Sequence, residues 1–328
     1  MISPRLISLV AAIAATSPSF AERSYINDKK APENRHDLEV IQKHLTQVLP
    51  KARKATVCID LGEGSGSGVV ISKDGLILTA AHVTGGVGKE FTVVFEDGRK
   101  VTAESLGLNS ETDAAMARIL DDGTYPFVPY DRNSSTRLGD WVFSLGHSGG
   151  FDKDRGSVVR IGRLVRMSDT TIQSDCNLIG GDSGGPLFDL EGRLIGIHSR
   201  VGNRLPENMH VPMNEFLENW DAMSKSEFLG EGPFAKKPEK GKGFLGLLAE
   251  KHDKAGLKVK KVGRESPAEE AGIKIGDVLL KMDGVELERR DDFKDLMKEK
   301  APDDRVVFEM LRNGKVETLT LRLGNRDD

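Results

Sequence analysis

The sequence predicts a mainly β protein with more than one domain, and three observations support this fold class. Its 328 residues correspond to two or three domains at about 150 residues per domain. The 36 glycines follow no repeat, which indicates many tight turns. Short apolar runs alternate with turn sequences such as 73–75, 96–98 and 190–192 over roughly 160 residues, as strands do in a β-barrel or sandwich.

The composition is that of a soluble globular protein. Lys and Arg total 47 against 51 Asp and Glu, a net charge of −4, and 38% of the residues are hydrophobic. This balance excludes a basic nucleic-acid-binding tail and an acidic disordered tail, so no nucleic-acid partner is expected. With only Cys58 and Cys176 the chain cannot have a disulfide scaffold, and whether these two are bridged stays open at this point.

Residues 1–21 have the pattern of a secretory signal peptide. One basic residue precedes an apolar run, 6–15, that is about half the ~20 residues a membrane-spanning helix needs. Small side chains at Ser19 and Ala21 then fit cleavage after Ala21. We therefore expect an exported protein, periplasmic or extracellular, without a stable membrane span. Retention of this segment as an anchor is the alternative.

Hydrophobic periodicity predicts the elements up to residue 229. Residues 22–54 form an N-terminal segment with an amphipathic helix, which begins at Asn34 and ends at Pro50. Residues 55–229 form a β domain closed by a helix over 212–225. Its strands are expected at 55–61, 68–72, 76–80, 91–95, 115–119, 141–145, 187–189 and 194–198.

A change in composition marks a second domain. Residues 230–243 are rich in Pro, Gly and Lys, which indicates a linker. The remaining segment, 244–328, has the length of one small α+β domain. It combines helices near 267–271 and 291–300 with strands over 258–262, 277–282, 305–311 and 316–323.

Three residues suited to nucleophilic catalysis occur in the order His, Asp, Ser. Ser183 lies in the heptapeptide 181–187, whose glycines permit a sharp turn that exposes the hydroxyl and aims backbone N–H groups at one pocket. His82 ends an apolar strand among small residues, and Asp113 opens another. Taken alone, each of these residues is better explained by a structural role than by a catalytic one. Their order and local sequences favour a catalytic triad.

These motifs resemble those of the trypsin-like serine proteases, and of the HtrA/Deg family most closely. The matching segments are 64–71, 79–82, 112–113 and 181–187. The resemblance implies a two-barrel, chymotrypsin-like fold in which Ser183 is the nucleophile, His82 the general base and Asp113 the carboxylate that orients it. It also implies an oxyanion hole made by the backbone N–H groups of Gly181 and Ser183.

Positions near the nucleophile bear on substrate specificity. The residue six before the serine, acidic in trypsin-type pockets, is Asn177, and the resemblance places Leu178 and Val201 on the pocket walls. Cleavage after medium-sized apolar residues such as Val, Ile, Leu or Ala is therefore expected. Asp182 departs from the family pattern, which has Asn there, and we expect its carboxylate to bond locally.

The C-terminal segment resembles a PDZ domain of the HtrA type, on residues 243–247 and 266–284. The resemblance implies a loop that holds the carboxylate of a peptide, which adds as a strand to the sheet. This loop would consist of Phe244, Leu245, Gly246 and Leu247. Phe293 and Met297 would complete a pocket for the last side chain, although the same apolar residues would equally build a closed core.

The sequence thus predicts an exported serine endopeptidase that degrades unfolded or misfolded proteins through an acyl-enzyme, with a PDZ domain that binds peptide C-termini. The alternative is a PDZ-based chaperone or binding module with minor proteolysis. The resemblance also implies a homo-oligomer, a trimer or a multiple of one. No ligand-spaced His/Cys cluster or phosphate-binding loop occurs in the sequence, so we expect neither a metal nor another cofactor.

Overall fold

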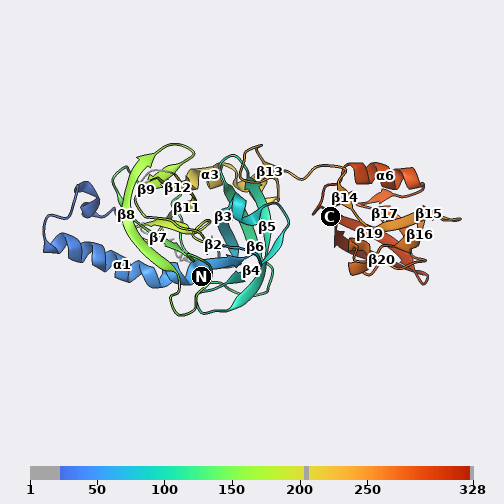
Figure 1. Cartoon of the computed structure of the whole chain (residues 1–328), viewed down its shortest axis with the longest axis horizontal. Helices are drawn as coiled ribbons and strands as arrows, with labels where there is room; N and C mark the ends of the chain where they lie inside the picture. Colours follow the sequence, from blue (N-terminus) through green and yellow to red (C-terminus); the bar gives the residue numbers. More distant parts are fainter. Residues whose placement is uncertain (1–22, 203–206, 326–328) are drawn as a thin grey trace, which may run out of the picture.

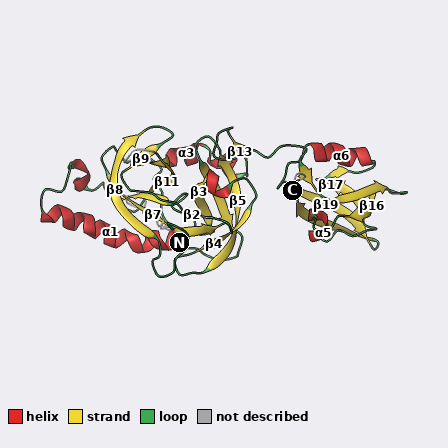
Figure 2. Ribbon diagram, viewed as in Figure 1, coloured by secondary structure: helices red, strands yellow, loops and turns green. Residues whose placement is uncertain are grey.

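A computed structural model describes residues 23–202 and 207–325, so the predicted signal peptide lies outside the described residues. Strands dominate the fold, and most of the helices are short (Figure 2). An N-terminal helix and two barrels occupy the chain up to residue 229, and an extended segment leads to a smaller domain that begins at 243 (Figure 1). The mainly β, two-barrel fold class is confirmed.

The long helix α1 (Arg35–Ala55) precedes the barrels, and the side chain of Asn34 caps its first turn. The prediction that Pro50 ends this helix is wrong, because α1 continues through it. Pro50 removes one backbone donor, but it does so at an exposed position. Ala52 and Ala55 in the last turn are buried in the core, and their packing stabilises the helix beyond the proline.

The first barrel is a ring of six strands filled by apolar side chains. Its strands follow the order β5-β4-β1-β2-β3-β6, and β5 pairs with β6 to close the ring. The short β13 (Phe228–Leu229) adds to β5 in parallel. Buried inside are Ile59, Ile77 and Val93. The strands are β1 (Thr56–Asp60), β2 (Ser65–Val70), β3 (Leu76–Ala80), β4 (Glu90–Val94), β5 (Lys100–Asn109) and β6 (Ala114–Ile119).

The second barrel also has six strands, in the closed order β10-β11-β12-β9-β8-β7. Two short helices follow it, α3 (Met213–Glu218) and α4 (Trp220–Ser224), where the sequence predicts one helix over 212–225. The chain departs from helical geometry at Asn219 between them. The strands are β7 (Trp141–Gly146), β8 (Val158–Met167), β9 (Ile172–Ser174), β10 (Pro186–Asp189), β11 (Leu194–Val201) and β12 (Asn208–Pro212).

The C-terminal domain is a sheet that carries two helices, α5 (Pro267–Glu270) and α6 (Arg290–Lys298), close to their predicted positions. The main sheet runs in the order β15-β16-β17-β19-β20, so that β15 is an edge strand. Its strands are β15 (Leu247–Lys251), β16 (Leu257–Val262), β17 (Val278–Met282), β18 (Val285–Glu286), β19 (Arg305–Arg312) and β20 (Lys315–Arg322), and β14 (Gly243–Phe244) pairs separately with β21 (Gly324–Asn325).

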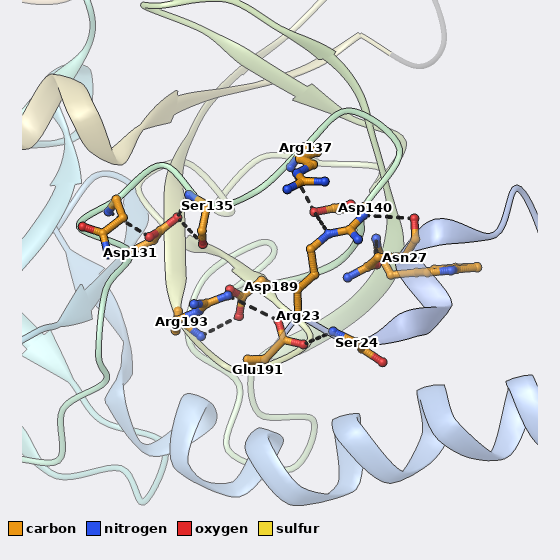
Figure 3. Close-up of polar contacts among 12 residues, drawn as sticks. Arg23, Ser24, Asn27, Asp131, Ser135, Arg137, Asp140, Asp189, Glu191 and Arg193 are labelled. Atoms are coloured by element: carbon orange, nitrogen blue, oxygen red, sulfur yellow. Dashed lines mark hydrogen bonds and ion pairs between the residues drawn. The ribbon is translucent and has the colours of Figure 1, made fainter. Parts of the chain in front are cut away.

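The segment before α1 packs against the second barrel of its own chain (Figure 3). Arg23 forms an ion pair of 2.5 Å with Asp140, directly before β7, and the Ser24 N–H donates to the carboxylate of Glu191 at 3.0 Å. Asp140 is almost fully buried, so this pair neutralises a charge that water does not reach. The 3-10 turn η1 (Tyr25–Asp28) then directs the chain toward α1.

Candidate active site

The three predicted catalytic residues come from both barrels. His82 lies on α2 (Ala81–Thr84), the single turn that follows β3, and Asp113 lies directly before β6. The Ala81 N–H donates to the Asp113 carbonyl at 2.9 Å, which ties these two segments of the first barrel together. Ser183 lies in the turn that leads into β10 of the second barrel.

His82 and Asp113 form the best-defined contact of the site. His82 Nδ1 lies 2.9 Å from Oδ2 and 3.0 Å from Oδ1 of Asp113, and the His82 N–H also donates to Oδ1 at 3.0 Å. Asp113 is fully buried, whereas the histidine side chain is 35% exposed. With Nδ1–H donating to this carboxylate, the lone pair of the imidazole lies on Nε2, on the side of the ring that can accept a proton.

Ser199 of β11 links the two barrels at the site, a contact that the sequence analysis does not predict. Its hydroxyl donates to Asp113 Oδ2 at 2.5 Å. Its carbonyl oxygen lies 3.5 Å from the Ser183 hydroxyl, the only hydrogen-bond partner of that hydroxyl in the described part of the chain. No hydrogen bond joins His82 to Ser183 among the described residues. The contact between the Ser183 hydroxyl and His82 Nε2 is therefore not formed in this structure, and catalytic hydrogen bonds often tighten only when substrate is bound.

The backbone of the turn before Ser183 presents two unpaired donors. The N–H groups of Gly181 and Ser183 donate no hydrogen bond within residues 23–202 and 207–325. The Gly180 carbonyl accepts from the Gly149 N–H at 2.7 Å, and because the C=O and N–H of one peptide point in opposite directions, the Gly181 N–H points away from that loop. A Cβ at Gly181 would lie 2.5 Å from the His147 carbonyl, so glycine is required there.

Ser67 of β2 supports this turn from the first barrel. Its hydroxyl donates to the Gly181 carbonyl at 2.8 Å and accepts from the His147 N–H at 2.9 Å. Its own N–H donates to the Ser183 carbonyl at 2.7 Å. The glycine-rich segment 64–71, which carries the resemblance, thus positions the nucleophile turn.

Asp182 forms local hydrogen bonds, as expected, and also an ion pair with a residue that is distant in the sequence. Its carboxylate accepts from the Ile179 N–H at 2.9 Å and from the Ser148 hydroxyl at 2.6 Å. It further forms an ion pair of 3.1 Å with Arg160 on β8. The sequence did not reveal Arg160 as its partner, because the closure of the second barrel brings the two residues together.

Two of the three predicted pocket residues, Leu178 and Val201, are paired with Asn208, which the sequence did not single out. Asn177 is exposed, Leu178 is buried and Val201 is 55% exposed. The Leu178 N–H donates to Asn208 Oδ1 at 2.9 Å, and Asn208 pairs with Val201 across β11 and β12. Asn208 therefore connects Leu178, through its side chain, with Val201, through the strand pairing.

A residue from the predicted linker lies beside the candidate base. The Phe234 N–H donates to the Ser110 carbonyl at 3.2 Å, which places residues 230–235 against the first barrel. The Phe234 ring centroid lies 6.5 Å from that of His82, and the guanidinium of Arg200 lies 5.0 Å from the Phe234 ring. The Phe234 ring thus lies next to the imidazole of His82.

Both cysteines are free and buried, Cys58 in the first barrel and Cys176 in the turn before the nucleophile. Burial raises the pKa of each thiol to about 11, so neither is a nucleophile at neutral pH. His198 and His210 are also buried, with their Nδ1 atoms 2.9 Å apart. The described residues contain no group of three or more His, Cys, Asp or Glu side chains arranged to hold a metal ion.

The C-terminal domain has a groove of about 680 Å³ between β15 and α6. All four residues of the predicted carboxylate loop line it, together with Phe293 and Met297 of α6. Leu245 and Met297 are also buried in the core of the domain, so the same residues line the groove and build the core. Three lysines, Lys261, Lys294 and Lys298, also line this groove.

Two six-stranded barrels, with a histidine–aspartate pair on one and a glycine-flanked serine on the other, define the class of trypsin-like serine peptidases. Residues 66–197 match the family model described as a trypsin-like peptidase domain, and residues 243–323 match that of the PDZ domain. The chain belongs to the HtrA/Deg family of these peptidases, with a PDZ domain after the barrels.

Curated relatives agree with this assignment. The chain is 30% identical over 302 residues to the serine protease Do-like HtrA of Bacillus subtilis, covering 82% of this chain and 65% of that protein. It is 28% identical over 282 residues to a probable periplasmic serine endoprotease, DegP-like, of Halomonas elongata, covering 80% of this chain and 57% of that protein. The chain thus spans less than two thirds of the length of each of these relatives.

Solved structures of similar proteins include a serine endoprotease from Yersinia pestis, with a TM-score of 0.49 and 25% identity over 85% of this chain and 97% of that one. Another is the HtrA-type protease AlgW with a decapeptide, with a TM-score of 0.48 and 23% identity over 87% of this chain and 98% of that one. In the described part of the present chain, none of the helices is both long and apolar enough to cross a membrane.

Proposed function

We propose that the chain is an exported serine endopeptidase that hydrolyses unfolded or misfolded proteins. The observation that carries this proposal is the combination of the hydrogen bond between His82 and the buried Asp113 with the two unpaired N–H groups of Gly181 and Ser183. A binding module has no need for a base and an anion site beside one serine. An acyl transfer needs both.

In the proposed reaction, Ser183 Oγ attacks the carbonyl carbon of the scissile peptide and its proton passes to His82 Nε2. Asp113 stabilises the imidazolium through Nδ1–H, and the N–H groups of Gly181 and Ser183 donate to the oxyanion of the tetrahedral intermediate. His82 then gives the proton to the leaving amine as the C–N bond breaks. Water, deprotonated by His82, then attacks the acyl carbon, the ester C–O bond to Ser183 breaks, and His82 returns the proton to Ser183 Oγ as the acid product leaves.

The pocket and the groove suggest the substrate class. Leu178 and Val201 are apolar and Asn177 is uncharged, which favours Val, Ile, Leu or Ala before the cleaved bond over Lys or Arg. In the PDZ domain the free edge of β15 offers backbone groups to a peptide strand, with the loop from Phe244 to Leu247 as the carboxylate site. The lysines of the groove would favour a chain that ends in a negative charge.

Export and assembly complete the proposal. The pattern of residues 1–21 and the periplasmic names of the DegP-like relatives support export, with cleavage after Ala21. We further propose a homo-oligomer, a trimer or a multiple of one. Because the segment before α1 packs on its own barrel, the exposed side of α1, including Leu38, is the surface we expect to meet another subunit.

The test compares the mature chain with Ser183→Ala on casein, with fragments mapped by mass spectrometry. Wild-type protein should produce fragments that end in apolar residues, and the variant should lose at least about 10³-fold in rate, because without its nucleophile a triad retains little activity. Its thermal unfolding should match that of the wild type. If both proteins fail to cleave but suppress the aggregation of an unfolded client equally, the PDZ-based chaperone is the correct function.

A further inference from the structure

An acidic side chain lies in the interior directly before the candidate nucleophile. The Asp182 side chain is 0% exposed, and a Cβ at Gly146 would lie 2.5 Å from its Oδ1, so the carboxylate is closely packed as well as buried. An isolated carboxylate in such a place is strongly unfavourable unless a cation accompanies it.

The cation is Arg160, on β8 of the same barrel. Its Nη2 lies 3.1 Å from Asp182 Oδ2 and 3.0 Å from the Ser148 hydroxyl, and its side chain is 18% exposed. In the described part of the chain it forms an ion pair with no other carboxylate. The two charges therefore neutralise each other inside the barrel, and Ser148 bonds to both.

This pair is connected to the turn that carries the oxyanion donors. Oδ2 of Asp182, the atom that faces Arg160, also accepts from the Ile179 N–H and so closes the turn 179–182. Within that turn lies the peptide whose N–H is the Gly181 donor. Opposite it, Arg155 donates to the carbonyls of Ser148 and Gly150, which stiffens the facing loop.

We propose that Arg160 is a positioning residue for the oxyanion hole. By neutralising Asp182 it keeps that carboxylate inside the barrel, on the Ile179 N–H, and so keeps the Gly181 N–H directed at the reacting carbonyl. Without the guanidinium, the carboxylate turns toward water and the turn loses its anchor. The inference rests on the proposed peptidase function and assigns to this arginine a role in the chemical step without contact to substrate.

The test is a charge-balance series of Arg160→Met, Asp182→Asn and the double variant, each assayed with a chromogenic peptide. Arg160→Met should lower kcat about 10- to 100-fold and leave KM within twofold. This fall in kcat is no larger than the one expected when a whole oxyanion-hole donor is removed. The double variant has no charge at positions 160 and 182, and an amide at 182 still accepts from the Ile179 N–H. Its kcat should therefore be at least about tenfold higher than that of Arg160→Met. The control is Arg166→Met, at an exposed arginine on the same strand, which should behave as wild type.

A second readout reports the oxyanion hole directly. A peptidyl trifluoromethyl ketone forms a tetrahedral adduct with Ser183 whose oxyanion occupies the hole, so its affinity should fall in parallel with kcat/KM in Arg160→Met and return in the double variant. Wild-type kcat in a folded Arg160→Met variant, or a double variant as impaired as Arg160→Met, would overturn the inference alone. A wild-type chain without activity would instead overturn the proposed function.

Discussion

The two barrels have the same number of strands but differ in what fills them. The first contains aliphatic and aromatic side chains, among them Ile59 and Ile77. The second has a smaller apolar cluster and, beside it, the buried pairs His198–His210 and Arg160–Asp182. A large change in side-chain volume destabilises apolar packing, but a change in pH does not. A buried polar pair destabilises the fold when one partner is removed or when its protonation state changes.

The two barrels also have different roles in the candidate site. The first barrel supplies His82 and Asp113 from the ends of its strands, and a rigid apolar core is sufficient to hold these ends in place. The second barrel holds a turn whose backbone N–H groups must point in one direction, and hydrogen bonds fix direction as apolar contacts do not. Stability and catalysis should therefore respond to different substitutions in the two barrels.

The largest effect is expected from Ile59→Ala in the first barrel. Ile59 is fully buried, and loss of its side chain leaves a cavity that should lower the free energy of unfolding by about 2–5 kcal/mol. The rate per folded molecule should remain within twofold of wild type. Trp141 and Trp220 are the only tryptophans and both lie in the peptidase domain, so their fluorescence in urea reports this domain alone.

The matched control for that substitution is Val165→Ala, on the outside of the second barrel, where the side chain is 38% exposed. It should change the unfolding free energy by no more than about 0.5 kcal/mol. A loss below about 1 kcal/mol in Ile59→Ala, or a proportional loss of activity per folded molecule, would contradict the separation of tasks.

The next effect concerns pH and distinguishes the second barrel from the first. Burial lowers the pKa of His210 to about 3 and, with Arg160 and the other imidazole nearby, lowers the pKa of His198 well below its ordinary value. The unfolded chain takes up protons near pH 6.5 and the folded chain does not, so stability is complete above about pH 6.5 and falls as pH is lowered toward 3. At pH 5, His210 alone should lower the free energy of unfolding by about 2 kcal/mol relative to neutral pH.

His210→Gln tests this loss. The variant is expected to be less stable at every pH, because the bonds to His198 and to the Ser174 hydroxyl are altered. The informative quantity is the difference in unfolding free energy between pH 7.5 and pH 5, which should shrink by about 2 kcal/mol relative to wild type. An unchanged difference would mean that His210 is not a source of acid sensitivity.

Most strands of the two barrels and the candidate triad could be proposed from the sequence for a common reason: local sequence suffices to indicate them. Apolar runs bounded by glycine turns gave the strands around His82 and Ser183, and small neighbours marked both residues. Strand β5, with Lys100 and Glu104 on its outer face, and strand β8, interrupted by Arg160, Arg163 and Arg166, lack a continuous apolar run and were missed. A strand with one side in water has a pattern that resembles a loop.

The supporting residues were not open to prediction, because closure of the barrels creates their contacts. Ser199 reaches Asp113 across 86 positions of sequence, and Arg160 reaches Asp182 from another strand of the same barrel. The local sequence around either residue does not indicate which residue it contacts. Phe234 was missed for a different reason, since the Pro, Gly and Lys around it indicate a linker and conceal one anchored aromatic ring.

The smallest effect is expected from Phe234→Ala, at the segment that belongs to neither barrel. The Phe234 ring lies next to His82, and the guanidinium of Arg200 lies 5.0 Å from its centroid. Contacts of this kind contribute about 0.5–1.5 kcal/mol, which corresponds to about two- to tenfold in rate. We expect kcat/KM to fall by that factor, with thermal unfolding unchanged within 2 °C or so.

The control for this last substitution is Phe127→Ala, at a ring that is 40% exposed and packs on Lys51 of α1. It should leave kcat/KM unchanged. If Phe234→Ala is equally silent, residues 230–235 serve only as a tether, and the active site is built by the two barrels alone. If it lowers the rate as expected, the segment that leads to the PDZ domain also shapes the site, and a displacement of that segment by the PDZ domain would reach His82 through a single ring.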